Sequence, residues 1–552
     1  MFPSGIKTRL TLWSLASLLP YGSVAYPSVN LNWTFNSRPD IQAPRTIFSI
    51  YDESLVTPGY VLMTPYTPLA GSNLAAGSGS ITSITAENCL ADVVTLETVF
   101  AETIQNGPYI YDHKGNLVYS GFGHVGGAST HDIKLTAYNG QPHLSFYNGQ
   151  DLIGGGRGHG VIMDSTYHTV ATVQSGNGRA PNDIHEFTVL PGGTAITTVF
   201  EPVQYDLSAY NVSQPVGWVL EGIFQEIDIN TGEVLFEWRS LDHTDLSESY
   251  NERGSFSEGG DGLTIKTAWD YFHLNAVEKD DEGNYLISSR YLCALFKING
   301  KDGSIMWRLN GKKNEFKFVG FNNTFAFQHH ARVRSQNAST TTISIFDNGS
   351  DGENTTSLYS SGMVMSVNTD AKVCTLVSQY RTPDGGLLTT SQGNTQLLPN
   401  TNVFMGWGSR PYMTEFTEDG TCIMMGQYGA DVNSAAMSYR VFKIGYNDWV
   451  GNPDSTPAVW ATANSTAGST TIYASWNGAT QLANWQFWGS VNGTNHFTKL
   501  GVATKTGFET TFVTSKYYQW TYAEALAADG NVLGKSLERK TYMPARNPTA
   551  AR

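Results

Sequence analysis

The segment Leu295-Phe-Lys-Ile-Asn-Gly-Lys-Asp-Gly-Ser-Ile-Met-Trp307 holds two short apolar runs on either side of a turn built from Asn, Gly and Asp. Runs of this kind joined by Asn-Gly or Asp-Gly turns are typical of antiparallel β-hairpins. Similar units recur at 107–119, 224–238 and 413–425, with offset hairpins at 186–200, 274–290 and 396–408. Hairpins repeated over about 400 residues, with almost no helical periodicity, predict a β-propeller. A parallel β-helix, the alternative, would need much shorter repeats.

The pattern changes near residue 450. Residues 451–457 are rich in Asn, Pro and Ser, which is the composition of a linker. Short strand-like runs then follow at the spacing of a β-sandwich, over 471–476, 485–488, 511–513 and 517–522. We therefore expect an all-β chain with a propeller over 26–455, a small sandwich resembling fibronectin type III over 456–536, and a frayed basic tail over 537–552.

The composition excludes several classes of protein. The chain has 552 residues, with 34 Lys and Arg against 48 Asp and Glu, so its formal net charge is −14. An acidic chain is a poor partner for nucleic acid or for an anionic membrane surface, and we expect neither as a partner. Only 15% of the residues are charged and 12% are aromatic, which is incompatible with a disordered chain.

The N-terminal residues 1–25 have the features of a secretory signal peptide. Lys7 and Arg9 precede an apolar run from Leu10 to Leu19, and Ser23-Val-Ala25 offers small residues for cleavage after Ala25. The run is shorter than the roughly 20 residues that a membrane span needs. We expect a protein that is secreted or held in the lumen of the secretory pathway.

Passage through the secretory pathway would permit disulfide bonds and N-linked glycosylation. Cys89, Cys293, Cys374 and Cys422 allow two disulfides in three connectivities, and the alternative is four buried thiols. No Cys-x-x-Cys pair is present, so zinc and thioredoxin chemistry are not expected, and we predict no metal. Eight sequons are candidate glycosylation sites, at Asn32, Asn211, Asn322, Asn337, Asn348, Asn354, Asn464 and Asn492.

Four regions place a histidine among other polar residues at the expected start of a strand. These regions are 130–132 with His131, 183–187 with His185, 269–277 with His273, and 325–332 with His329. In a propeller the inner strands begin at the central channel, so residues far apart in sequence can converge there. A lone histidine is more often an ordinary hydrogen-bonding partner, the interpretation we favour for His131, His159 and His243. We nevertheless keep His131 as a candidate substrate-binding residue.

The order of His185-Glu-Phe187, His273-Leu-Asn275, Arg290 after Ile-Ser-Ser, and Gln328-His329 resembles that of the arylsulfotransferase family of six-bladed propellers. The segments 226–234, 346–348, 391–396 and 475–480 look like its secreted fungal branch. The resemblance covers nearly all of the chain beyond the signal peptide, including the sandwich.

The resemblance implies a two-step transfer of a sulfuryl group from an aryl sulfate to a phenol. His329 would be the sulfated nucleophile, Arg290, His273 and Asn275 would hold sulfuryl oxygens, and His185 would assist the aryl oxygen. A neutral imidazole suits the first role, and the spread negative charge of the sulfuryl group suits fixed donors. No cofactor is implied, and the chain has no Gly-x-x-x-x-Gly-Lys-[Ser/Thr] loop for a nucleotide sulfate.

Three pairs of alternative interpretations concern the site and the loops around it. His330 follows His329, and side chains alternate between the faces of a strand, so either could be the nucleophile. We choose His329 because Gln328-His329 matches the family, and we keep His330 as a substrate-binding candidate. The loop 154–160 resembles a phosphate cradle but lacks the strand-loop-helix context, so we interpret it as a flexible loop near the channel mouth. The acidic segments 280–283 and 347–351 lack calcium-loop spacing and predict hairpin turns.

Two other functions fit the same channel. One is a cofactor-free cyclase of fungal secondary metabolism, of the hetero-Diels-Alder type with tropolone or terpenoid substrates, in which the histidines and the arginine would only donate hydrogen bonds. The other is a non-catalytic binding propeller. In each case we expect a small aromatic or phenolic ligand and a monomer or weak dimer.

Overall fold

The segment 295–307 forms a hairpin, as its sequence predicts. In the computed structural model, β17 (Ala294–Ile298) pairs with β18 (Ile305–Asn310) across a turn in which Gly303 donates its N–H to the carbonyl of Asn299 at 2.9 Å. Gly303 has a φ of 75°, a conformation that favours glycine, which explains the Asp-Gly pair in the turn. The acidic segment 280–283 likewise forms the turn between two strands, because Asp280 donates its N–H to Asn284 at 2.8 Å.

The structure describes residues 32–67, 105–125, 128–152, 154–213, 216–255, 259–383, 385–430 and 434–544. All of them lie in the second of two compact units, Leu31–Arg552. The expected signal peptide, Cys89 and the last residues of the tail fall outside the described residues. Nearly all regular structure is β, and α2 (Phe122–Val125) is the one α-helical segment among the described residues.

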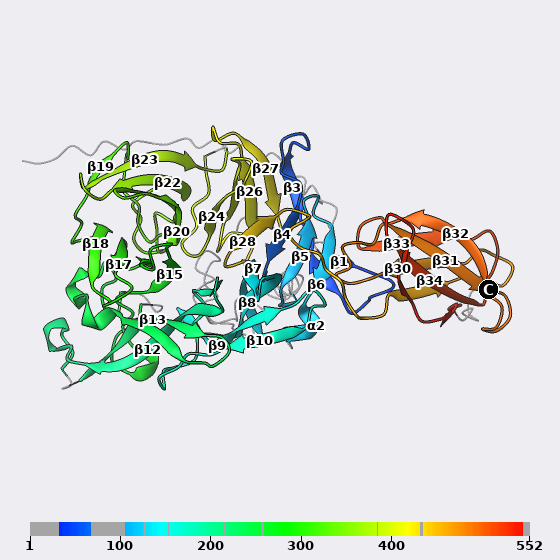
Figure 1. Cartoon of the computed structure of the whole chain (residues 1–552), viewed down its shortest axis with the longest axis horizontal. Coiled ribbons are helices and arrows are strands. Elements are labelled where there is room, and N and C mark those ends of the chain that lie inside the picture. The colour runs from blue at the N-terminus through cyan, green and yellow to red at the C-terminus, as the bar shows by residue number, and fades with distance from the viewer. Residues whose placement is uncertain are drawn as a thin grey trace, which may run out of the picture. The chain divides into compact units, whose positions relative to one another are not determined.

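Six sheets of four or five strands follow one another along the chain (Figure 1). The first two contain β7 (Ser129–Tyr138), β8 (Gln141–Leu152), β9 (Gly155–Met163) and β10 (Thr169–Val173), then β11 (Phe187–Leu190), β12 (Thr194–Tyr205), β13 (Gly217–Asp228) and β14 (Val234–Arg239). The third contains β15 (Leu274–Lys279), β16 (Tyr285–Ser289), β17 and β18. The fourth contains β19 (Lys317–Val319), β20 (His329–Gln336), β21 (Thr340–Asp347), β22 (Ser361–Asn368) and β23 (Val373–Tyr380).

The last two of these sheets combine strands from both ends of this region. One contains β24 (Asn394–Leu397), β25 (Val403–Gly406), β26 (Tyr412–Phe416), β27 (Cys422–Gln427) and, at its edge, β3 (Ile47–Tyr51). The other contains β28 (Val441–Ile444), β4 (Tyr60–Met63), β5 (Tyr109–Asp112) and β6 (Leu117–Ser120). All pairings are antiparallel except that β19 runs parallel to β23. Pairing of early with late strands fastens the two ends of the region to each other.

The six sheets contact one another in a closed circle. β7 contacts β11, β12 contacts β15, β15 contacts β20, β20 contacts β24, β24 contacts β28, and β28 contacts β7 again. Apolar residues fill the spaces between neighbouring sheets, as in the cluster that packs Phe224 and Trp238 of one sheet against Tyr285 and Phe296 of the next. This arrangement brings the beginnings of β7, β11, β15, β20, β24 and β28 together.

The rest of the chain forms smaller sheets. β1 (Asn32–Thr34) pairs with β2 (Gln42–Pro44). One C-terminal sheet contains β29 (Ala458–Thr462), β30 (Thr471–Ser475) and β33 (Glu509–Val513). The second contains β31 (Asn484–Ser490), β32 (Thr498–Thr504), β34 (Trp520–Leu526), β35 (Val532–Lys535) and β36 (Arg539–Lys540). The two share a core that includes Ile472, Trp485 and Phe487.

Two expectations from the sequence are corrected here. The tail was expected to fray from residue 537, yet Arg539–Lys540 forms β36 on β34, and Tyr542 donates its N–H to Ala461 at 2.8 Å. Backbone hydrogen bonds to β34 and to Ala461 therefore hold the chain in place past residue 536. Cys293, Cys374 and Cys422 are free thiols, so none of the disulfides that the sequence allows is formed by the described cysteines. No helix of the described residues is both long and apolar enough to cross a membrane.

Candidate functional site

A cavity lies where the innermost strands begin. It has about 430 Å³ of empty space, part of it open to solvent, and residues on or next to strands of all six sheets contribute to its wall. The lining residues are Tyr66, Asp151, Leu152, Gly154, Gly155, Ile184, His185, His273, Arg290, His329, Ser391, Gln392 and Tyr439. The structure thus brings together His185, His273, Arg290 and His329, four residues that the sequence singled out.

His185 and His273 are held in the same way, each by a carboxylate a few residues earlier in the chain. The carboxylate of Asp183 bonds both the backbone N–H and Nδ1 of His185. The carboxylate of Asp270 does the same for His273, with 3.0 Å to the backbone N–H and 2.5 Å to Nδ1. The two rings meet edge to face with their centroids 4.5 Å apart. Each histidine therefore directs Nε2 away from its carboxylate.

His329 has a different partner. Its Nδ1 lies 2.7 Å from Oδ1 of Asn348, and its Nε2 lies 3.2 Å from the backbone nitrogen of Gln392. The His329 side chain is almost fully buried. The pKa of His329 lies well below its usual value. Burial is the largest cause and the charge of Arg290 the next, while the hydrogen bond to Asn348 raises the pKa and offsets part of this shift. The ring is therefore neutral near pH 7 and has a lone pair available.

Arg290 supplies the positive charge at the cavity. Its guanidinium donates to Oη of Tyr291 and to the carbonyl of Thr390, both at 2.8 Å. These bonds fix a planar donor group beside the histidines, and its charge helps burial to lower the pKa of His273. Burial raises the pKa of Asp270 well above its usual value, and the charge of Arg290 opposes this rise. A fixed arginine of this kind suits an anion that carries several oxygens.

Tyr66, Gln392 and Tyr439 also line the cavity, and the sequence did not single them out individually. The ring of Tyr439 lies 5.6 Å from His185 and 6.3 Å from His329, centroid to centroid, and its buried hydroxyl has no hydrogen-bond partner among the described residues. Gln392 donates Nε2–H to Oη of Tyr66 at 2.8 Å. Gln392 lies in the segment 391–396 that resembles the arylsulfotransferase family, which was its one signal.

A network of buried charges lies on or next to β7, β11, β20 and β28. Arg440, which is fully buried, pairs with Asp132 at 2.9 Å and with Glu186 at 3.2 Å. Lys134 bridges the same two carboxylates, at 2.7 and 3.1 Å, and Arg332 pairs with Glu186 at 2.7 Å. Burial by itself would raise the pKa of Glu186. The three cations outweigh this effect and lower that pKa well below its usual value. Sequence reasoning missed this network because its members are scattered over 308 positions of the chain.

Three predicted site residues are not among those that line the cavity. Asn275 donates its amide to the carbonyl of Gln328 at 2.7 Å. His330 lies against Phe442 and accepts from the backbone of Thr395 at 3.4 Å. His131 bonds Asp151, which does line the cavity, at 2.7 Å. We therefore no longer assign direct substrate contact to these three residues, and the geometry favours His329 over His330.

Two other expectations fail for reasons of packing. Asn348 was a candidate for glycosylation, but its side chain is completely buried and its Nδ2 donates to two carbonyls, so it has no room for a glycan. The remaining sequons are at least partly exposed. Residues 154–160 are not a flexible loop, because Gly155–Met163 forms β9. A Cβ on Gly155 would lie 2.6 Å from Oδ1 of Asp183, so glycine permits the strand to pass the carboxylate that holds His185.

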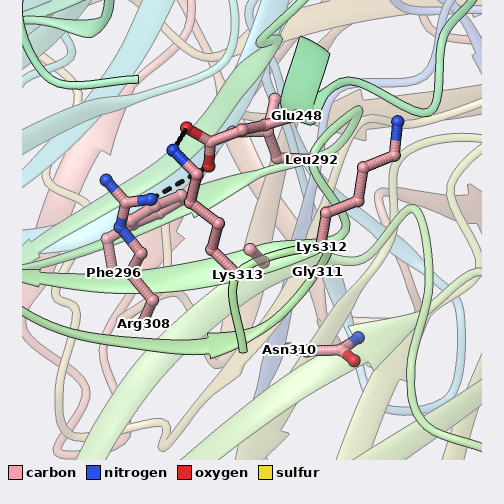
Figure 2. Close-up of a pocket in the computed structure, with 9 residues that line it drawn as sticks. Glu248, Leu292, Phe296, Arg308, Asn310, Gly311, Lys312 and Lys313 are labelled. Carbon is pink, nitrogen blue, oxygen red and sulfur yellow. Dashed lines mark hydrogen bonds and ion pairs between the residues drawn. The ribbon is translucent and has the colours of Figure 1, made fainter. Parts of the chain in front are cut away.

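A second hollow lies beside β17 and β18, and its charges are already paired. Figure 2 shows Arg308 and Lys313 directed at Glu248, with salt bridges of 3.0 and 2.8 Å. Lys312 donates to the carbonyls of Ser247 and Ser249. This hollow is therefore a packed ion-pair cluster. Across the described part of the chain, no group of three or more His, Cys, Asp or Glu side chains is arranged to hold a metal ion.

A family model described as arylsulfotransferase (ASST) matches residues 134–429, which include His185, His273, Arg290 and His329. This chain belongs to the arylsulfotransferase family. The match supports an arylsulfotransferase-like, transferase-type function in general. No curated protein matches the chain.

Solved structures give only distant similarities. A protein of unknown function from Bacteroides caccae is 12% identical over 67% of this chain and 93% of that chain, with a TM-score of 0.34. A protein from Lactobacillus plantarum is 10% identical over 76% and 93%, with a TM-score of 0.33. A catalytically inactive virginiamycin B lyase from Staphylococcus aureus is 8% identical over 74% and 93%, with a TM-score of 0.27. Similarities at this level carry no argument about the present chain.

Proposed function

We propose that this protein moves a sulfuryl group from an aryl sulfate to a phenol through a sulfated His329. The observation that carries the proposal is that His185, His273, Arg290 and His329 line one cavity in a member of the arylsulfotransferase family. The cavity is small and its wall includes Tyr66 and Tyr439, which suits an aromatic ring.

In the first half-reaction the lone pair on Nε2 of His329 leaves its hydrogen bond with the N–H of Gln392 and attacks sulfur. The N–S bond forms, the bond from sulfur to the aryl oxygen breaks, and its electron pair leaves with that oxygen. A histidine that bears a proton on Nε2, in our proposal His185, protonates the leaving phenolate. Arg290 and His273 donate to the sulfuryl oxygens, which stay anionic throughout.

In the second half-reaction the acceptor phenol enters the same space. Its proton passes to His185, its oxygen forms a bond to sulfur, and the electron pair of the N–S bond returns to Nε2 of His329. The enzyme is then unchanged, and no nucleotide sulfate takes part. Because one site serves both half-reactions, we expect ping-pong kinetics.

The test is to incubate the protein with a chromogenic aryl sulfate and a phenol, and then to digest it under alkaline conditions. We expect the peptide that carries His329 to gain the mass of one SO₃ group when the phenol is omitted, and to lose it when the phenol is added. His329→Gln should abolish both the adduct and phenol release. His168→Gln, at a histidine exposed on the surface, is the matched control. Absence of adduct and turnover with several aryl sulfates would exclude the proposal.

The same variant separates sulfuryl transfer from a cyclisation in this cavity. A cyclisation that uses hydrogen bonds and proximity alone would be slowed in His329→Gln, because the remaining donors persist. Sulfuryl transfer has no nucleophile without His329 and should stop. The binding-only alternative predicts unchanged ligand affinity without any product.

We also propose that the six sheets are the blades of a six-bladed propeller and that the sheets from β29 to β36 form a fibronectin type III-like sandwich. Cleavage of a signal peptide after Ala25 would send the chain into the secretory pathway. Glycans would then lie on exposed sequons such as Asn211, Asn322 and Asn337. A mass decrease on treatment with an N-glycosidase, absent from the peptide that contains Asn348, tests this assignment.

A further inference from the structure

Asn348, the residue directly after β21, makes three hydrogen bonds that fix the orientation of its side chain. Nδ2 donates to the carbonyl of Thr389 at 3.0 Å and to that of Gln392 at 3.1 Å. Oδ1 faces Nδ1 of His329 at 2.7 Å. Turning the amide over would direct its oxygen at two carbonyl oxygens, so only one orientation is compatible with the site. Since an amide oxygen can only accept, Nδ1 of His329 must be the donor.

The contact of Nε2, the other ring nitrogen of His329, also places the ring proton on Nδ1. The backbone N–H of Gln392 donates to Nε2 at 3.2 Å, and a nitrogen that accepts a hydrogen bond has its lone pair free of a proton. Gln392 thus supplies a carbonyl to Asn348 and an N–H to His329. The two contacts assign the proton to Nδ1 and the lone pair to Nε2.

The neighbouring histidines differ from His329 in this respect. Nδ1 of His185 and Nδ1 of His273 face the carboxylates of Asp183 and Asp270. A carboxylate can balance the positive charge of an imidazolium, whereas a neutral amide cannot. Two histidines of the cavity therefore face a carboxyl group through Nδ1, and His329 alone among these three faces a neutral amide.

We propose that Asn348 is the positioning residue that designates His329 as the nucleophile, by holding the proton on Nδ1 through both half-reactions and so leaving the lone pair of the resting ring on Nε2. This inference rests on the proposed sulfuryl transfer. The surrounding charges agree with this inference. Among the described residues, the charges of Arg290 and Arg440 both disfavour an added positive charge on His329, and His185 and His273 are the neighbouring titratable groups.

The chemistry explains why a neutral partner is needed. When Nε2 forms its bond to sulfur, the proton on Nδ1 stays in its bond to Asn348, so the adduct is an N-sulfonated imidazolium. In the second step the N–S bond breaks and its electron pair returns to a neutral imidazole, which is a good leaving group. A carboxylate at position 348 would take the Nδ1 proton from the adduct. The leaving group would then be an imidazolide anion, and transfer to the phenol would slow.

The tautomer can be measured without any sulfuryl donor. In protein labelled with nitrogen-15 in histidine, the His329 signals are identified by their absence from His329→Gln. We expect a protonated Nδ1 and an unprotonated Nε2 between pH 5 and 8. A proton on Nε2, or a cationic ring at neutral pH, would overturn the inference. Because this experiment needs no turnover, its result is independent of whether the protein transfers sulfuryl groups.

Asn348→Asp tests the kinetic consequence. We expect the acidic limb of the pH profile for adduct formation to move up by about one to three units, as for a histidine beside a carboxylate. Discharge of the adduct to a phenol should slow by about tenfold or more, the effect of a poorer leaving group. Asn354→Asp, at an exposed position in the same loop, is the matched control.

An unchanged pH profile and adduct lifetime in Asn348→Asp would refute the kinetic role. If this variant does not fold, the nitrogen-15 measurement on the unsubstituted protein still decides the tautomer. Adduct formation with the wrong tautomer would reject this inference and leave the proposed function standing. The expected tautomer without any adduct would reject the proposed function instead.

Discussion

Replacing Arg440 by methionine removes the one cation of the buried network that is fully enclosed by protein. Its guanidinium bonds Asp132, Glu186 and the backbone carbonyls of His185 and Asn275, at 2.9 to 3.3 Å. It therefore fastens β28 to β7 and to the starts of β11 and β15. Methionine has a similar length and no charge, so the change isolates the electrostatic contribution from packing.

The structure limits how large the loss can be. Removing one partner from a buried ion pair usually costs about 3–5 kcal/mol, because the other charge stays buried alone. Here Asp132 keeps Lys134, and Glu186 keeps Lys134 and Arg332, so neither carboxylate is left without a cation. The two carbonyls do lose a donor, at about 1–3 kcal/mol each when unsatisfied. We expect the free energy of unfolding to fall by about 4 kcal/mol.

Guanidinium unfolding followed by tryptophan fluorescence measures this difference, with Arg38→Met as the control. Arg38 pairs with Asp40 on the surface, so its replacement should change the unfolding free energy by less than about 1 kcal/mol. We also expect activity to fall in Arg440→Met, since the carbonyl of His185 loses its anchor. An unfolding free energy within about 1 kcal/mol of the unsubstituted protein would refute the reasoning.

Two further predictions concern the cavity and its supporting loop. Gly155→Ala should lower kcat by about tenfold or more while leaving the fold intact, because its Cβ would displace the carboxylate of Asp183 that orients His185. Steady-state kinetics checks this against Gly123→Ala, whose Cβ would meet nothing within 4 Å. Burial raises the pKa of Asp347 to about 7, so the folded protein binds this proton more tightly than the unfolded chain does. Its stability should therefore fall as the pH rises from about 4 to 7, and Asp347→Asn should lose that part of the pH dependence, as measured by thermal unfolding at each pH.

Local sequence patterns predicted the strands well and the site in part. The segment 295–307 forms β17 and β18 because its turn residues and alternating side chains favour a hairpin without help from distant residues. The cluster of His185, His273, Arg290 and His329 was expected from their order and neighbours. Tyr439 was not expected, since an aromatic residue before a strand has no distinctive local pattern. Its role depends on which side chains from other sheets surround it.

Asn348 shows where sequence information ends. As Asn-Gly-Ser it reads as a glycosylation site, because a sequon is defined by three adjacent residues and contains nothing about solvent exposure. The sequence by itself determined the hairpins, their turns and the residue types that carry the chemistry, all of which depend on neighbours in the chain. Only the tertiary structure decided that Asn348 is buried against His329, that His330 and Asn275 do not line the cavity, and that Arg440 joins carboxylates up to 308 positions away. These outcomes depend on the closing of six sheets into a circle, which sets distances between residues that no local pattern relates.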